Sequence, residues 1–251
     1  MLPISVSIIA CNEADRISGA IESLPDASEV VVVDSGSTDN TVDVARSLGA
    51  RVIETDWPGH IRQKNRALQM CQQEWVLFLD ADERLNAELV SAVHQAITRE
   101  NGPVAYRMRR RNCYLGIPIK AGSFGPQWHI RLARREVAVW GGEDPHDRLM
   151  VTGVVGKLPG HIEHNPYRHF SEHLETMEAY SARFVEVSLE KGRRARLVDV
   201  LFRPPWHFFR SMVIQAGWRD GVVGVLLAWL ASAYVALKWT RLWLAKSMAE
   251  R

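Results

Sequence analysis

The 251-residue chain is poor in cysteine, and its cysteines lie far apart in the sequence. They are Cys11, Cys71 and Cys113. An odd number of cysteines without close spacing excludes a disulfide-stapled scaffold and a paired-cysteine metal site, and it fits a reducing compartment. The first residues also lack a basic segment ahead of an apolar one, so we expect no signal peptide.

A strong excess of either charge is absent as well. The net charge is +2 at pH 7, with 24% charged and 47% apolar residues. This balance predicts a sizeable core, excludes a disordered tail and gives no global basic field for binding nucleic acid. The charge is nevertheless uneven, because residues 1–151 carry 17 Lys and Arg against 20 Asp and Glu, whereas residues 152–251 carry 14 against 9.

The chain also has no internal repeat, no low-complexity segment and no Gly-x-Gly-x-x-Gly fingerprint after a predicted strand. The small residues from Ser35 to Asp39 are not followed by Gly-Lys-Ser or Gly-Lys-Thr, so they do not form a P-loop. In this loop we expect Ser37 or Thr38 to cap the helix that follows.

The first hundred residues alternate regularly between β-branched runs and helical spacing. We predict strands at 4–9, 29–33, 51–55 and 75–79, and helices at 15–24, 39–48, 61–71 and 85–97. Strands that alternate with helices predict an α/β fold with a mainly parallel sheet.

The pattern loosens after residue 104. Further strands are expected at 106–111, 129–134 and 137–140, and a helix at 170–189. Beyond Leu201 the composition changes, because five of the nine tryptophans lie between residues 206 and 243. We therefore expect one domain over residues 1–190 and a basic, tryptophan-rich helical region over 191–251.

Polar and acidic side chains follow three of the predicted strands. Asn12 and Glu13 follow the first, Asp34 ends the second, and Asp80 and Asp82 follow the fourth. The carboxyl ends of parallel strands meet at one edge of a sheet, where ligands bind. Carboxylates suit Mg²⁺ or Mn²⁺. A lone Asp-x-Asp pair is also compatible with simple helix capping, but three such strand ends favour a binding site.

These segments, 5–13, 30–39 and 75–83, resemble family 2 glycosyltransferases of the GT-A fold. Within that family the chain is most similar to the bacterial lipopolysaccharide core glucosyltransferase branch. The closer similarity lies in Gln63-Lys64-Asn65, in residues 140–147 and in the aromatic tail. It implies a GT-A domain over residues 1–190, with a nucleotide-sugar half at 1–100 and an acceptor and catalytic half at 101–190.

The resemblance implies a nucleotide pocket formed by three residues. Asp34 would contact the uracil or ribose of a nucleotide-sugar, and Asn12 and Glu13 would line the same pocket.

The resemblance also implies a divalent metal site. Asp80 and Asp82 would form the Asp-x-Asp pair, with Asp82 the better ligand for Mg²⁺ or Mn²⁺. Lys64 would lie near the diphosphate, where a cation suits the charge, although a solvated helix lysine is the alternative.

Inverting sugar transfer also needs a general base, and the candidates are Glu143, Asp144 and Asp147. Asp144 precedes Pro145 and is expected as a helix N-cap, which would place Asp147 in the first helical turn. The related branch usually has His-Glu where this chain has His146-Asp147, so we assign the base to Asp147. Asp144 is the alternative, because many family 2 enzymes use a Glu-Asp base.

Two other clusters have plainer interpretations. Four histidines lie close together in the sequence, at His161, His164, His169 and His173. No cysteine joins them and Pro166 interrupts the segment, so we do not assign zinc. We expect partly exposed histidines, and one of them would suit a position near the diphosphate or the acceptor. The arginine-rich segment 107–111 would suit a phosphate-bearing acceptor, but a solvated strand edge fits it as well.

The resemblance implies an inverting, metal-dependent enzyme that moves a hexose, with UDP-glucose as the expected donor, to a membrane-associated glycan or glycolipid such as lipopolysaccharide core. One alternative is transfer to a polyprenyl phosphate. Another is a catalytically silent, membrane-bound scaffold.

Membrane attachment is expected from the C-terminal region. Val222–Leu237 contains sixteen residues without a charge, which is short of the roughly 20 that span a bilayer. Residues 183–219 carry eight Lys and Arg against three Asp and Glu, which would attract an anionic leaflet. We expect peripheral or monotopic attachment to the cytoplasmic side of the inner membrane.

Overall fold

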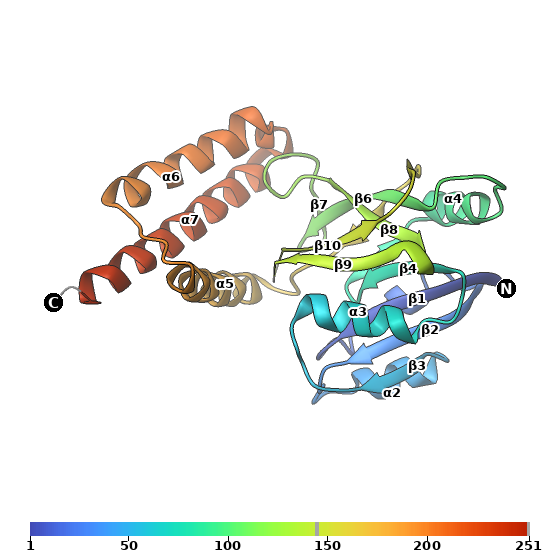
Figure 1. Cartoon of the computed structure of the whole chain (residues 1–251). Coiled ribbons are helices and arrows are strands. Elements are labelled where there is room, and N and C mark those ends of the chain that lie inside the picture. Colours follow the sequence, from blue (N-terminus) through green and yellow to red (C-terminus); the bar gives the residue numbers. More distant parts are fainter. Residues whose placement is uncertain (144–145, 250–251) are drawn as a thin grey trace. The chain divides into compact units, whose positions relative to one another are not determined.

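The computed structural model describes residues 1–143 and 146–249, which divide into two compact units (Figure 1). The sheet unit comprises Met1–Arg111 and Gln127–His164, and the helical unit comprises Asn112–Pro126 and the described residues from Asn165 onward. The chain thus divides after residue 164 rather than at the expected boundary of 190. The reason is that the helix beginning at Phe170 packs against the C-terminal helix.

The sheet unit alternates strands and helices over its first half. In chain order its elements are β1 (Leu2–Ala10), α1 (Ile17–Ile21), β2 (Ala27–Asp34), α2 (Thr41–Ser47), β3 (Arg51–Glu54), α3 (His60–Met70), β4 (Trp75–Asp80), β5 (Glu83–Leu85), α4 (Ala87–Ile97), β6 (Ala105–Tyr114), β8 (Gln127–Arg134), β9 (Ala138–Glu143), β10 (His146–Val151), β11 (Val155–Lys157) and β12 (Ile162–His164).

The strands form one large sheet in the order β3-β2-β1-β4-β8-β6-β12-β5. The first four are parallel, whereas β8 pairs antiparallel with both β4 and β6. The predicted α/β fold with a mainly parallel sheet is therefore confirmed for the first half. The antiparallel strands β8 and β6 extend the sheet beyond β4.

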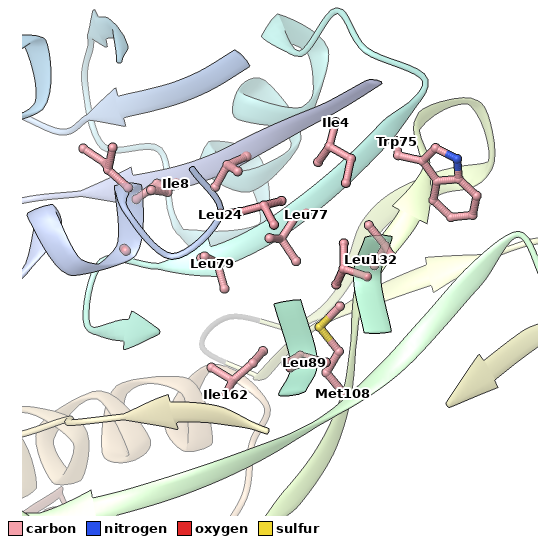
Figure 2. Packing of buried hydrophobic residues seen from close by; sticks show 14 of the residues in the cluster. Ile4, Ile8, Leu24, Trp75, Leu77, Leu79, Leu89, Met108, Leu132 and Ile162 are labelled. Atoms are coloured by element: carbon pink, nitrogen blue, oxygen red, sulfur yellow. The ribbon is translucent and has the colours of Figure 1, made fainter. Parts of the chain in front are cut away.

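Among the parallel strands, β1, β2 and β4 are buried on both faces, as continuous apolar runs predict, whereas no residue of the edge strand β3 is buried. On one face, Ile4, Ile8 and Leu77 pack with helices α1 and α4. Figure 2 shows these three side chains together with Leu24 and with Leu89 of α4. On the other face, Val76 and Phe78 pack with α3 and with the hairpin formed by β9 and β10. The hairpin and α3 therefore cover the same side of the sheet.

Two predicted helices have different bounds. The first is only the five-residue α1, because Leu24 precedes Pro25, and a residue before proline disfavours the helical region. Leu85 was expected to begin the fourth helix but belongs to β5, where it pairs with Ile162. Asn86 is the N-cap of α4, and its side chain accepts a hydrogen bond from the Leu89 N–H at 3.1 Å.

The expected helix after Asp144 is wrong. Asp144 and Pro145 lie outside the described residues, but the chain on either side forms an antiparallel hairpin in which Asp147 pairs with Gly142. Leu149 pairs with Trp140, and both side chains are buried against the sheet. Burial of this apolar pair outweighs the local capping signal, so Asp147 lies on strand β10.

The helical unit contains the two-residue strand β7 (Ile117–Pro118) and three long helices, α5 (Phe170–Glu190), α6 (Leu197–Phe209) and α7 (Gly221–Ala249). Helices α5 and α6 both pack against α7. The cores lie along α7, around Leu227 and Leu230 near its start and around Val235 and Leu242 farther along.

Helix α6, the start of α7 and the short helical turns between them carry exposed apolar side chains. These residues are 44–75% exposed and comprise Leu197, Val198, Leu201, Phe202, Trp206, Phe209, Val213, Ile214, Trp218, Val222, Val225, Leu226 and Trp229. No residue of α6 is buried. A patch of this size indicates an interaction surface rather than scattered exposed side chains.

The segment Gly217–Ala245 is also long and apolar enough to cross a membrane, judged by length and composition, and 28% of its most apolar window is buried. The uncharged stretch found in the sequence, Val222–Leu237, is therefore the first half of the longer helix α7.

Candidate active site

The loops after β1 and β2 are bonded to each other. Asn12 adopts a left-handed backbone conformation, and its side-chain oxygen accepts hydrogen bonds from the Thr38 N–H at 2.8 Å and the Thr38 hydroxyl at 3.2 Å. The Asn12 N–H donates to the Ser37 hydroxyl oxygen at 2.8 Å. Ser37 and Thr38 therefore do not cap the next helix as expected. Helix α2 begins after Asn40, which makes no side-chain capping bond.

The two acids of these loops are held by their own segments. Asp34 is 1% exposed and accepts hydrogen bonds from the N–H groups of Gly36 and Ser37 at 3.0 and 2.9 Å, and from the Ser37 hydroxyl. Glu13 accepts two bonds from the Arg16 guanidinium, at 2.6 and 2.8 Å. These carboxylates shape the loops, and their contact with a nucleotide remains a prediction.

A buried arginine links the Asp-x-Asp segment to β8. One guanidinium nitrogen of Arg131, Nη2, lies 2.8 Å from Asp80 Oδ2 and 2.7 Å from Glu83 Oε1. Arg131 is 4% exposed and Glu83 is 0% exposed. The register between β6 and β8 skips Arg131, since Tyr106 pairs with Leu132 and Arg107 with Ile130. Such a bulge redirects a side chain, here toward the two carboxylates.

The charges of this buried group are coupled. Burial would raise the pKa of Asp80, but the Arg131 guanidinium and the Lys64 ammonium hold the pKa of that carboxyl well below its usual range. Burial raises the pKa of Glu83, and Arg131 cancels only part of that rise.

Lys64 joins the Asp-x-Asp segment to the hairpin. Its Nζ lies 3.2 Å from Asp80 Oδ1 and donates to Asp147 Oδ2 at 2.8 Å. It also lies 4.5 Å from the centre of the Trp140 ring. Only 11% of the Lys64 side chain is exposed, so the alternative of a solvated helix lysine is wrong.

The residues beside Lys64 hold helix α3 in place. Asn65 accepts a hydrogen bond from the Trp140 N–H at 2.9 Å and donates to the Trp140 carbonyl at 2.8 Å. Buried Gln63 donates to the Ser35 hydroxyl at 2.9 Å. Gln63, Lys64 and Asn65 are consecutive in α3. Their side chains thus contact the loop after β2, the carboxylates of Asp80 and Asp147, and strand β9.

Asp82 has a different partner from Asp80, the imidazole of His164. His164 Nε2 is 3.2 Å from Asp82 Oδ2, and both side chains are mostly buried. Within residues 1–143 and 146–249, no cluster of three or more metal-ligating side chains forms. The Asp82 carboxylate suits Mg²⁺ or Mn²⁺ when substrate phosphates and water supply the other ligands, and the His164 imidazole lies beside it as a nitrogen ligand.

A cavity of about 550 Å³ opens beside Lys64. Its lining residues are Lys64, Asp80, Arg107, Arg110, Gln127, Trp128, His129, Ile130, Arg131, Trp140, Asp147, Arg148 and Leu149. The structure therefore brings together three expected site residues, Lys64, Asp80 and Asp147. The other expected residues do not line this cavity, and Asp144 lies outside the described part of the chain.

Sequence reasoning missed two residues of the site. Arg131 gave no local signal, since its partners are 48 and 51 residues away in the sequence. His164 was noticed only as one of four histidines, and what identifies it is its position across from Asp82.

Comparisons with known proteins find that the chain is similar to glycosyltransferases. The family model described as Glycosyl transferase family 2 matches residues 5–148. The lipopolysaccharide core biosynthesis glycosyltransferase LpsC of Rhizobium meliloti (strain 1021) is 30% identical over 94% of this chain and 90% of its own length. The uncharacterized glycosyltransferase RP128 of Rickettsia prowazekii (strain Madrid E) is 31% identical over 86% of this chain and 78% of its own.

Among solved structures, glucosyl-3-phosphoglycerate synthase from Mycobacterium tuberculosis, in complex with Mn²⁺, UDP and glucosyl-3-phosphoglycerate, is 26% identical, with a TM-score of 0.38. That match covers 53% of this chain and 57% of the other.

Replacing Arg131 with methionine should destabilise the sheet unit. The substitution leaves the fully buried Glu83 without its main partner, and breaking a buried ion pair in this way costs about 3–5 kcal/mol. Urea unfolding followed by tryptophan fluorescence measures the loss. Arg109→Met, an exposed arginine on β6, is the matched control and should change stability little. Equal stability of the two variants would contradict a structural role for Arg131.

Proposed function

The chain belongs to glycosyl transferase family 2, and we propose that it is an inverting, metal-dependent enzyme that moves a hexose from a nucleotide-sugar to a membrane-associated glycan or glycolipid. The observation that carries the proposal is the position of Lys64. It joins Asp80, from the strand ends of the nucleotide half, to Asp147 in a cavity formed largely by the other half. UDP-glucose is the proposed donor because the motifs resemble the core glucosyltransferase branch.

Asp82 and His164 would hold the divalent cation. Asp80 is already neutralised by Arg131 and Lys64, whereas Asp82 and His164 face each other across 3.2 Å. Mg²⁺ or Mn²⁺ bound there would offset the negative charge that grows on the leaving diphosphate. Asp80 then has a positioning role, because it holds Lys64 and Arg131 at the edge of the cavity.

Asp147 would act as the general base. An acceptor hydroxyl in the cavity attacks the anomeric carbon, its proton passes to the Asp147 carboxylate, and the bond from that carbon to the diphosphate oxygen breaks. Lys64 fixes the carboxylate through a hydrogen bond of 2.8 Å. The hairpin presents Asp147 on a strand supported by the buried Trp140–Leu149 pair.

Two alternative functions are less well supported. A polyprenyl phosphate acceptor would need less help from a base, so the placement of Asp147 in the cavity favours a hydroxyl acceptor. A silent scaffold would not need the buried charges of Arg131, Asp80 and Glu83 beside a cavity, since such charges are costly to bury.

The helical unit supplies a surface suited to a membrane. Its exposed apolar residues lie on α6, the start of α7 and the turns between them, and Arg203, Arg210 and Arg219 occur in the same stretch. An apolar surface with basic residues nearby fits the interface of an anionic bilayer. We therefore infer peripheral or monotopic attachment on the cytoplasmic side of the inner membrane, where nucleotide-sugars are available.

Asp147→Asn should reduce sugar transfer by about 10²–10⁴-fold, because the amide cannot accept the proton. Binding of UDP with Mn²⁺ should change little, since Asp147 lines the cavity whereas Asp82 and His164 do not. Initial rates with radiolabelled UDP-glucose and calorimetry with UDP measure the two effects. Asp144→Asn is the comparison. If the Asp147→Asn protein is active and the Asp144→Asn protein is inactive, the general base is Asp144 and not Asp147.

Asp82→Ala and His164→Ala should each weaken binding of UDP in the presence of Mn²⁺ by more than about tenfold, because each removes one metal ligand. Affinity without Mn²⁺ should stay the same. Isothermal calorimetry with and without Mn²⁺ tests both statements. Glu163→Ala changes an exposed neighbour on β12 and should behave as wild type. Undiminished dependence on Mn²⁺ in both variants would remove this pair as the metal site.

Phe202→Gln combined with Trp206→Gln should reduce binding to vesicles of phosphatidylethanolamine and phosphatidylglycerol by at least about tenfold, because two large apolar side chains leave the bilayer interface. Flotation of the full-length protein measures the bound fraction. Met70→Gln combined with Val154→Gln changes exposed apolar residues of the sheet unit and should have little effect. A wild-type protein that stays unbound and monomeric without detergent would contradict attachment.

A further inference from the structure

We propose that the cavity contains a binding subsite for a carboxylate or phosphate group of the acceptor. This inference rests on the proposed function, because it concerns the second substrate of the same site. It is carried by the charge of the lining and by the strands that form the walls.

The lining is rich in cations. Five lining residues are basic, Lys64, Arg107, Arg110, Arg131 and Arg148, and two are acidic, Asp80 and Asp147. Lys64 and Arg131 are engaged by the acids. Arg107 and Arg148 are exposed and form no ion pair within the described residues, so their charge is available to a ligand.

The lining also contains buried N–H donors that no acceptor satisfies within the described residues. They are Nε of Arg131, Nε of Arg110 and Nε1 of Trp140. Arg131 and Trp140 are 4% and 5% exposed. An unpaired buried donor costs about 1–3 kcal/mol, so the wall holds these three N–H groups at a cost in stability.

The strands that form the walls of the cavity indicate that this anion belongs to the acceptor. The lining comes mainly from β6, β8, β9 and β10, and it includes Asp147. Neither the β1 and β2 loops nor Asp82 and His164 contribute to it. An anion held by Arg107 and Arg148 would therefore lie beside the proposed base and outside the nucleotide pocket.

A histidine of the wall has a lowered pKa. Burial, and after it the charges of Arg131 and Arg110, lower the pKa of His129 to about 4. His129 is thus neutral at physiological pH and leaves the arginines as the charged groups of the wall. Arginine binds carboxylate and phosphate through paired N–H donors, which a neutral sugar does not match as well.

Arg107→Gln combined with Arg148→Gln tests the subsite. With the full-length protein, inorganic phosphate should raise the melting temperature of wild type, and this shift should disappear in the double variant. In transfer assays with UDP-glucose and Mn²⁺, wild type should use glucuronate or glucose 6-phosphate at least tenfold more efficiently than methyl glucoside. The double variant should lose that preference. Arg109→Gln combined with Arg111→Gln, on the same strand β6 but outside the lining, should keep both properties.

Two controls separate the possible sources of failure. Calorimetry with UDP and Mn²⁺ should give equal affinities for wild type and the Arg107→Gln/Arg148→Gln protein. A tenfold loss of affinity in the double variant would mean that the arginines bind the donor diphosphate, and it would overturn the proposal. Hydrolysis of UDP-glucose without acceptor reports the proposed function by itself. A wild-type protein that hydrolyses UDP-glucose but shows neither the phosphate shift nor the preference for anionic acceptors refutes the subsite alone.

Discussion

The buried contact of Arg131 with Asp80 and Glu83 is the interaction on which the arrangement of the site depends. A guanidinium that is 4% exposed needs carboxylates within hydrogen-bonding distance, and it has them at 2.8 and 2.7 Å. Because β4 carries Asp80 and β8 carries Arg131, the contact ties the end of the parallel part of the sheet to the antiparallel part. Replacing all three groups with apolar residues would be tolerated energetically. Their retention is therefore explained better by the position of Asp80 at the cavity than by stability.

Asp80 is shared between Arg131 and Lys64, and this sharing divides the roles of the Asp-x-Asp pair. The first carboxylate holds two cations, whereas Asp82 remains opposite His164. Lys64 in turn reaches Asp147, so one carboxylate of the nucleotide half and the proposed base have a common partner. Asn65 fixes the same helix to Trp140 through both backbone groups of that residue. A shift of α3 would consequently move the base and Asp80 together.

The parts of the structure that could be predicted from the sequence are those determined by local pattern. The parallel strands were predicted because β-branched runs bounded by polar residues leave few other choices. The hairpin around Asp147 was not, because Asp144-Pro145 is a strong local helix signal and the burial of Leu149 beside Trp140 appears only in three dimensions. Arg131 and His164 were missed for a related reason. Their partners are distant in the sequence, at Asp80 and Asp82, and the β8 bulge that redirects Arg131 has no sequence signature here.

The cations of the cavity are not a by-product of a basic chain. Residues 1–151, which supply every lining residue, carry more acidic than basic side chains, yet the lining itself has five basic residues and two acidic ones. A cleft lined by one sign of charge with low-dielectric walls concentrates its potential locally. Because the surrounding acids oppose binding of anions elsewhere on this part of the chain, the lining would select a ligand whose negative charge lies close to the reacting hydroxyl. A general attraction for polyanions would instead need an excess of basic residues over the whole surface.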